Sequence, residues 1–543
     1  MVVNLLWLAA LGPLALIAAG IAPGTLAGRS TRNRLGLALA AALMALAAAS
    51  VTLTAVIAYG AIRTELIGRD GTGLALYLDS VSAIIFVLVS FIGLIVVNYS
   101  RNYLDGDPGQ IRFTRWLCLT LAAVLMLIIS GNLFQFALAW IATSLSLHRL
   151  LVFYGERPNA VLAARKKFVA SRLGDLCLIG AMVLLHGAIG TLDYAGIFSA
   201  ADAMRASGIV PNSVQIAALL LVIAALLKSA QFPLHGWLLE VMETPTPVSA
   251  LLHAGIINAG GFLMVRFAHV IALSTSSLDT LALIGGLTAL FGSLVMLPQT
   301  SIKVSLAYST IAQMGFMMLE CGLGAFSAAF LHIVAHSFYK AHAFLSSGSV
   351  IDIARASWTP SPGGKPHPAR VIIAIVAVLG VTLAVSTVFG ATIAEEPGVF
   401  VLGSILVLSL VHLVANGIDE RPSAYVIGRT VLLAVVVAVT YFGLQLGVQK
   451  LLAGAVPPVA AIRGPLDIFI VGLVVLSFAA LTFFQSMLPS LAGTPKWQAS
   501  YALVSNGFYV NTLANRMALR FWPSPPPRGH LTSPSYLETG AQS

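Results

Sequence analysis

Charged residues are scarce in this chain. Of its 543 residues only 9% are Asp, Glu, Lys or Arg, whereas 58% are hydrophobic, and the mean hydropathy is +0.93. Soluble proteins carry about 25% charged residues, so the composition excludes a water-soluble protein of this size. Apolar stretches of about 20 residues recur along the whole length, which is the pattern of transmembrane helices. The sequence therefore predicts an all-α, polytopic membrane protein.

Cysteine is also scarce, and cofactor motifs are lacking. The three cysteines, Cys118, Cys177 and Cys321, lie far apart in apolar segments and not at metal-ligand spacing. No glycine-rich phosphate loop or dinucleotide fingerprint appears between a strand and a helix. We therefore expect no metal site and no cofactor in this chain. Residues 1–22 are apolar without a preceding basic region, so we interpret them as the first spanning helix and not as a signal peptide.

The apolar segments predict about fifteen spanning helices. They lie near 2–22, 35–60, 74–97, 113–131, 133–154, 167–190, 214–242 (broken), 246–273, 278–297, 302–322, 325–350, 371–393, 399–416, 425–447 and 466–487. With the N-terminus outside, inward segments hold 20 of the 30 basic residues and outward loops hold five. The positive-inside rule then places the C-terminus in the cytoplasm. Because topology explains most of the net charge of +10, we expect no nucleic acid partner.

The last 55 or so residues differ in composition, with a proline cluster and many polar residues. Within this tail Val510, Leu513, Met517 and Phe521 recur at helical spacing. Such an amphipathic helix could lie on the bilayer surface or dock a cytoplasmic partner. We expect the four residues to bind a partner, and the bilayer surface remains the alternative.

A few ionisable residues fall inside the predicted spans. They are Arg149, Lys228, Arg266, Lys303, Lys340 and Asp175. A charge at the bilayer centre costs roughly 2.5–3.5 kcal/mol on insertion scales, so such groups face a polar interior and often mark an ion pathway. Arg149 and Arg266 could instead reach an interface or form structural pairs.

The clearest pattern is FLHIVAHSFYKAHAFL, which places His332, His336 and Lys340 at i, i+4 and i+8. These positions share one helix face. We call these three residues the stripe. Histidine titrates near neutrality and can pass a proton in either direction, so the stripe predicts steps of a proton pathway. A zinc site is the rival interpretation, but no carboxylate or cysteine on the stripe completes it.

The segment LKSAQFPLHGWLLEVMETPTPVS combines Lys228 with a helix break at Pro233. Unpaired backbone groups in mid-membrane are tolerated only where they face protein or a water-filled cavity. We expect Lys228 to pair with Asp175, so that separating the two charges would release a proton. We expect His253, on the next span, to be the next group that receives this proton. The structural alternative is a kinked helix with a buried ion pair.

Three stretches closely resemble the antiporter-like membrane subunits of respiratory complex I and of multisubunit cation/proton antiporters. They read KSAQFPLHGWLLEVMETPTPVSALLHAGIINAGGFLMVR, IKVSLAYSTIAQMGFMML and HIVAHSFYKAHAFLSSGSVI, and the resemblance runs from about Leu74 to Ile351. It implies two inverted five-helix repeats, each with a broken helix. It also implies an ion pathway through the residues that match the family motifs, which are Lys228, Asp175, His253, Lys303, His332, His336 and Lys340.

Two departures from the family pattern stand out. Where the family has Trp-Glu at the start of the fifth span's polar stretch, this chain has Trp140 followed by Ile141. The span near 371–393 has no clear counterpart of the family's lysine or glutamate. A complex I core subunit would be expected to keep these features. The chain therefore resembles more closely the DabB family, the membrane subunits of two-component inorganic carbon pumps of bacteria.

That resemblance implies a bacterial inner-membrane location and a DabA-like cytoplasmic zinc protein as partner. Ion flow, with H⁺ favoured by the histidines, would drive CO₂ hydration to bicarbonate in the partner, and this chain would itself be no enzyme. The alternative is a proton-pumping subunit of an NADH dehydrogenase-like complex or of a multisubunit Na⁺/H⁺ antiporter. The expected organisation is N-terminal helices (1–112), a first repeat (113–273), a second repeat (274–424), C-terminal helices (425–487) and a cytoplasmic tail (488–543).

Overall fold

The computed structural model describes residues 2–22, 31–69, 71–348, 368–392, 396–408, 411, 424–458, 464–491 and 495–522. Six basic residues that entered the orientation count lie outside these ranges, as does the proline cluster of the tail; they are Arg29, Arg355, Lys365, Arg421, Arg463 and Arg528.

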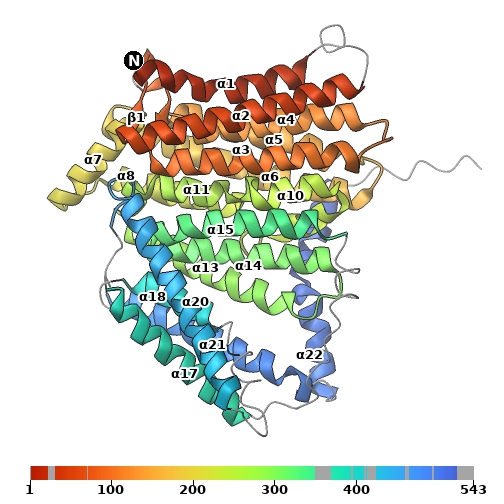
Figure 1. Cartoon of the computed structure of the whole chain (residues 1–543), viewed down its shortest axis with the longest axis vertical. Coiled ribbons are helices and arrows are strands. Elements are labelled where there is room, and N and C mark those ends of the chain that lie inside the picture. The colour runs from red at the N-terminus through yellow and green to blue at the C-terminus, as the bar shows by residue number, and fades with distance from the viewer. Residues whose placement is uncertain are drawn as a thin grey trace, which may run out of the picture.

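The first part of the molecule is a row of roughly parallel helices (Figure 1). It contains α1 (Val2–Ile21), α2 (Thr31–Tyr59), α3 (Ser80–Tyr103), α4 (Gln110–Ile128), α5 (Leu133–Leu151), α6 (Pro158–Ile189), α8 (Asn212–Lys228), α9 (Gly236–Glu240), α10 (Thr246–Ala254), α11 (Ala259–Arg266), α12 (Ala268–Ile271), α13 (Thr275–Met296), α14 (Ile302–Gly322) and α15 (Phe326–Leu345). Short 3₁₀ turns, η1 (Val241–Glu243) and η2 (Ile256–Asn258), precede α10 and α11.

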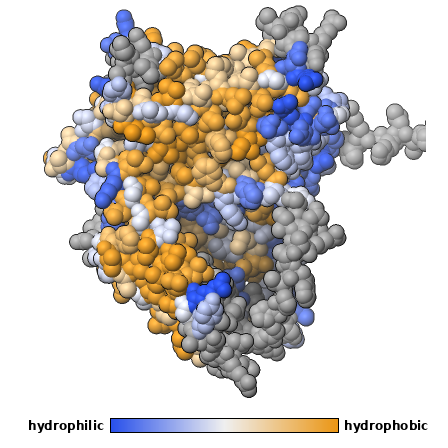
Figure 2. All heavy atoms as spheres, viewed as in Figure 1, coloured by the Kyte–Doolittle hydropathy of each residue, from blue (hydrophilic) through white to orange (hydrophobic). Residues whose placement is uncertain are grey.

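A second group of helices is tilted against this row (Figure 1). It consists of α17 (Pro368–Val388), α18 (Pro397–Leu408), α20 (Ala424–Leu451) and α21 (Pro465–Leu491). The tail follows as α22 (Pro495–Ser505), η3 (Gly507–Tyr509) and α23 (Val510–Phe521). Figure 2 shows hydrophobic residues over most of the visible face, with hydrophilic residues at the edges and also between the row of helices and the tilted group.

Within the described residues, nine helices are long and apolar enough to cross a membrane, and three further apolar helices are shorter. The chain is therefore a multi-pass membrane protein, and the count of fifteen spans and the two inverted repeats remain predictions. Of the described helices in residues 274–424, α13, α14, α15 and α17 each run for at least 20 residues. The predicted second broken helix therefore also remains a prediction.

The third span begins later than expected, at Ser80 and not near residue 74. Residues before it form two small antiparallel ribbons, β1 (Ile62–Arg63) with β4 (Tyr77–Leu78), and β2 (Ile67–Arg69) with β3 (Thr72–Leu74). Asp79 then caps the helix: its carboxylate accepts from the backbone N–H of Ser82, whose hydroxyl accepts from the N–H of Asp79. This capping box sets the start of α3.

The loops sort onto two sides of the bundle. The ribbons and α7 (Tyr194–Ser207) lie at one end of the helices, and α22 lies at the other (Figure 1). The tail meets the start of α6, where Arg165 donates to the backbone oxygen of Trp522 at 2.8 Å. The tail and the basic 155–167 segment therefore share one side, as the charge pattern predicts.

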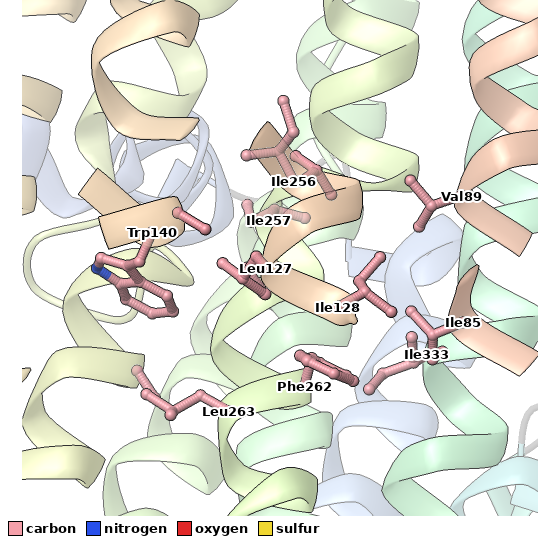
Figure 3. Packing of buried hydrophobic residues seen from close by; sticks show 14 of the residues in the cluster. Ile85, Val89, Leu127, Ile128, Trp140, Ile256, Ile257, Phe262, Leu263 and Ile333 are labelled. Carbon is pink, nitrogen blue, oxygen red and sulfur yellow. The ribbon is translucent and has the colours of Figure 1, made fainter. Parts of the chain in front are cut away.

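Buried hydrophobic residues form a continuous core across the row of helices. Figure 3 shows Ile85 and Val89 of α3, Leu127 and Ile128 of α4, and Ile333 of α15 converging from separate helices. A second core joins α13–α15 to the tilted helices. α13 and α14 approach so closely that a Cβ on Gly315 would lie 2.4 Å from the backbone nitrogen of Ala289.

Candidate functional site: a buried ionisable pathway

The break after Lys228 is built into the centre of the protein. α8 ends at Lys228, Ala230 adopts a left-handed conformation (φ 51°), and α9 resumes at Gly236. The freed backbone groups find partners on neighbouring helices: the N–H of Phe232 donates to the hydroxyl of Thr288 on α13 at 3.1 Å. The broken helix at this position is confirmed, and its polar backbone faces protein as membrane burial requires.

Lys228 is buried against Trp140 and not against Asp175. Its Nζ lies 4.3 Å from the centre of the Trp140 ring and donates to the Trp140 carbonyl at 3.5 Å. Asp175 instead pairs with Arg172, one helical turn earlier on α6, at 2.8 Å. Lys228 and Asp175 therefore form no direct ion pair, because a nearer cation at i−3 holds the carboxylate, but the charge of Asp175 still acts on Lys228.

The surroundings of Lys228 and Asp175 carry a further buried positive charge. The sequence placed Lys167 at the inward end of the span near 167–190, but α6 begins at Pro158 and Lys167 is 3% exposed. Its Nζ donates to both the carbonyl and the hydroxyl of Ser144 on α5, at 2.8 and 3.0 Å. Ile141, which replaces the family glutamate, is only partly buried and packs against the hydrophobic core. The charges of three cations, Arg172, Lys228 and Lys167, thus act on the carboxylate of Asp175.

His253 stands beside a second interruption. α10 ends one residue after it, and η2 separates α10 from α11. Its Nδ1 lies 3.0 Å from the hydroxyl of Thr310 on α14, and its ring stacks on Phe344 with centroids 4.3 Å apart. The two interruptions touch, since Ser229 donates to the carbonyl of Ile257 at 3.1 Å. The structure therefore joins the Lys228 break to the His253 break.

The predicted stripe on α15 faces the protein interior. Lys340 is fully buried and donates to the carbonyl of Leu306 at 3.2 Å, while His336 is 4% exposed. The rings of His332 and His336 are 6.1 Å apart. Neither ring nitrogen of His336 has a hydrogen-bond partner among the described residues, a costly state for a buried imidazole. Lys303 lies nearer the surface and donates to Thr246 at 3.4 Å.

A buried carboxylate that the sequence analysis overlooked extends this stripe. Glu320 on α14 is 5% exposed, and its Oε1 lies 2.9 Å from Nδ1 of His332. The sequence did indicate Glu320, because a lone acidic residue inside an apolar span is itself a functional candidate. Another carboxylate, Glu396, lies directly before α18. It accepts a hydrogen bond from Gln449 of α20 at 2.9 Å, beside a cavity of about 360 Å³.

One intramembrane charge is structural. Arg266 is 2% exposed and makes a two-pronged contact with Asp79 at 2.7 and 2.9 Å. Of the two interpretations offered for Arg266, structural pairing is the one the geometry supports. Arg149 is exposed and contacts the face of Trp116, 5.7 Å from its ring centre.

The tail helix binds the membrane domain through its polar side. Lys166 pairs with Glu240 of α9 at 2.7 Å, and Asn511 and Asn515 of α23 each donate to that carboxylate at 3.1 and 2.8 Å. Lys166 in turn donates to the side-chain oxygens of both asparagines. The amphipathic helix is confirmed, and its apolar residues point away: Leu513, Met517 and Phe521 are 61%, 55% and 83% exposed, and Val510 is half-buried.

A helix broken beside a buried lysine, followed by an interior stripe of histidine and lysine, defines an antiporter-like membrane subunit. Family models agree: residues 130–358 match the NADH:quinone oxidoreductase/Mrp antiporter transmembrane domain, and residues 71–114 match the N-terminus of complex I chain 5.

Two relatives with known family names identify the family within this class. The chain is 40% identical to the probable inorganic carbon transporter subunit DabB2 of Halothiobacillus neapolitanus, over 83% of this chain and 81% of the relative. It is 38% identical to the probable subunit DabB of Hydrogenovibrio crunogenus, over 82% and 83%. The chain belongs to the DabB family of antiporter-like, ion-translocating membrane subunits.

Solved structures support the fold. The chain matches a chain of the Mrp complex from Dietzia sp. DQ12-45-1b with a TM-score of 0.60 at 22% identity, covering 95% of this chain and 60% of that one. It also matches a chain of an archaeal membrane-bound sulfane sulfur reductase with a TM-score of 0.57 at 20% identity, covering 94% and 99%.

Proposed function

We propose that this chain is the ion-translocating subunit of a two-component inorganic carbon uptake complex in a bacterial inner membrane. The pathway would run from Lys228 and Asp175 through His253 to Lys340, His336 and His332, with Lys303 near its cytoplasmic side. The observation that carries the proposal is the contact at 3.0 Å between His253 and Thr310, which joins the two touching helix interruptions of residues 113–273 to α14 in residues 274–424. Interrupted helices supply polar backbone inside the membrane, where ions can pass.

The carbon-uptake role is favoured over a redox role by the extent of similarity. The DabB relatives are covered over 81% and 83% of their length. The NAD(P)H-quinone oxidoreductase chain 5 of Synechocystis is 39% identical, but only 40% of its length is covered. Similarity to the oxidoreductase is thus confined to a shared part, whereas similarity to DabB extends along most of the relative.

The partner in this proposal is a DabA-like cytoplasmic zinc protein, docked on Val510, Leu513, Met517 and Phe521. Three of these side chains are exposed together on a helix that the chain itself holds by polar contacts. An apolar helix face of this kind suits a hydrophobic groove on a partner. A flow of protons through this chain would then favour the hydration of CO₂ to bicarbonate in the partner. The partner, and not this chain, would carry out that reaction.

The test is carbon uptake by cells that lack carbonic anhydrase and express this chain with a DabA-like protein from the same genome. We expect labelled bicarbonate to accumulate only when both chains are present and to collapse when a protonophore is added. Copurification of a run of small membrane subunits, with no carbon uptake, would instead favour the antiporter or redox alternative.

A further inference from the structure

A groove on the lipid-facing side of the bundle is separate from the ion pathway. It has a volume of about 870 Å³ and lies between α1, α4 and α5. Its walls are mostly apolar and include Ile17, Leu119, Ala123, Met126, Leu138 and Leu145. Leu138 and Leu145 are 54% and 46% exposed, so the groove opens to the membrane.

The groove has the length of one membrane leaflet. Along α5 it extends from Gln135 to Arg149, which is a rise of about 21 Å at 1.5 Å per residue. A bilayer is about 40–45 Å thick with its headgroups, so one leaflet is about 20–22 Å. The length of the groove therefore suits an acyl chain of one leaflet.

One end of the groove is cationic. The guanidinium groups of Arg115 and Arg149 lie 5.9 and 5.7 Å from the ring centre of Trp116. Trp116 also lines a second cavity of about 510 Å³, together with Arg34, Arg112 and Arg115. In the part of the chain that the structure describes, none of these four arginines forms an ion pair with a carboxylate. Their charge is therefore available to an anion.

We propose that this groove and the adjoining cavity form a binding site for an anionic phospholipid of the phosphatidylglycerol type. The single phosphate lies among Arg115, Arg149 and the second cavity, and an acyl chain follows the groove toward Gln135. Arginine suits phosphate because its planar fork donates two hydrogen bonds at once. Basic cavities between spanning helices on the cytoplasmic side suit anionic headgroups, and tryptophan favours the headgroup level. One groove and one headgroup cavity match a lipid with one phosphate.

The test measures lipid retention by the full-length chain after delipidation in detergent, using native mass spectrometry with phosphatidylglycerol, cardiolipin or phosphatidylcholine added. We expect one tightly held phosphatidylglycerol and no comparable phosphatidylcholine. The pair Arg115→Gln with Arg149→Gln should weaken binding about 30-fold, since each interfacial arginine contributes about a factor of five. A second variant, Ala123→Phe with Ala142→Phe, keeps the charges but fills the groove and should also lose the lipid.

The matched control is Arg516→Gln with Arg520→Gln, which removes two exposed arginines of α23 on the same side but outside the groove. It should hold phosphatidylglycerol as the unaltered chain does. Equal retention of phosphatidylcholine, or unchanged binding in the Arg115/Arg149 variant, would overturn the proposal. Stronger retention of cardiolipin would overturn the assignment to a lipid with one phosphate.

Discussion

Glu320 of α14 and His332 of α15 are hydrogen-bonded through atoms 2.9 Å apart inside the protein. This contact adds a carboxylate to the His332–His336–Lys340 stripe, which otherwise has only basic groups. A carboxylate beside an imidazole can accept and return its proton, so Glu320 extends the proposed pathway beyond the end of the stripe.

Glu320→Gln should reduce ion flux about tenfold or more, because the amide keeps the shape but cannot exchange a proton. Glu320→Asp should retain part of the flux. Flux is measured in proteoliposomes containing the purified complex. Glu156→Gln, which alters an exposed acid between α5 and α6, is the control and should be normal. Full flux in Glu320→Gln would make the contact a structural one only.

Lys228→Ala should abolish ion-coupled carbon uptake while the protein still inserts. Lys228 is the buried cation at the helix break, and alanine cannot carry charge there. Arg69→Ala, at an exposed position of β2, should have no effect in the same cells. Near-normal uptake with Lys228→Ala at normal protein levels would refute the role given to the break.

Asp175→Asn should be nearly as harmful, for a reason that the structure supplies. Its loss leaves Arg172, Lys167 and Lys228 without a compensating carboxylate, and an unpaired buried charge is costly. Arg172→Gln separates two explanations: if Asp175 matters through Lys228, this variant should keep partial uptake, whereas an equal loss would show that the Arg172–Asp175 pair itself is required.

The stripe is tested by combining changes. His332→Ala and His336→Ala alone should reduce uptake by different amounts, since a water molecule can replace one missing group more easily than two. The double variant should be close to inactive. His186→Ala, which lies in the last turn of α6, is the control. Normal transport by the double variant would assign the stripe to packing.

Leu513→Asp with Met517→Asp should release the soluble partner without unfolding the membrane domain, because both side chains are exposed and the helix is held through Asn511 and Asn515. Deleting residues 488–543 should have the same effect and stop uptake. Partner recovery is measured by copurification, with Ile209→Asp, exposed on the opposite side, as control. Full recovery by the truncated chain would leave α23 as a membrane-surface helix.

The Arg266–Asp79 pair should dominate local stability at the start of α3. Asp79→Asn keeps an oxygen that can cap the helix but leaves the buried Arg266 guanidinium without its carboxylate, so we expect a loss of about 3–5 kcal/mol. Thermal unfolding in detergent measures it, with Asp202→Asn, at a half-exposed position (53%), as the reference. An equal, small effect of both changes would contradict the structural role.

The membrane class, most helix positions and the stripe on α15 could be predicted from the sequence. These features depend on local properties: apolar length sets a span, and a period of four places His332, His336 and Lys340 on one face. The start of α3 was misplaced because the residues before Asp79 are apolar but pair as strands. Apolar composition alone does not distinguish a short buried strand from a helix.

What only the tertiary structure decided is which polar groups meet. Lys228 lies against Trp140, Glu320 reaches His332, and Lys166 joins Glu240 to the tail. In a medium without water each buried charge must find a partner, but the sequence does not indicate which of several candidates lies nearest. Distance in space, set by how the helices pack, makes that choice. Composition and period therefore determined that this chain spans a membrane with charges inside it, and packing determined how those charges are connected.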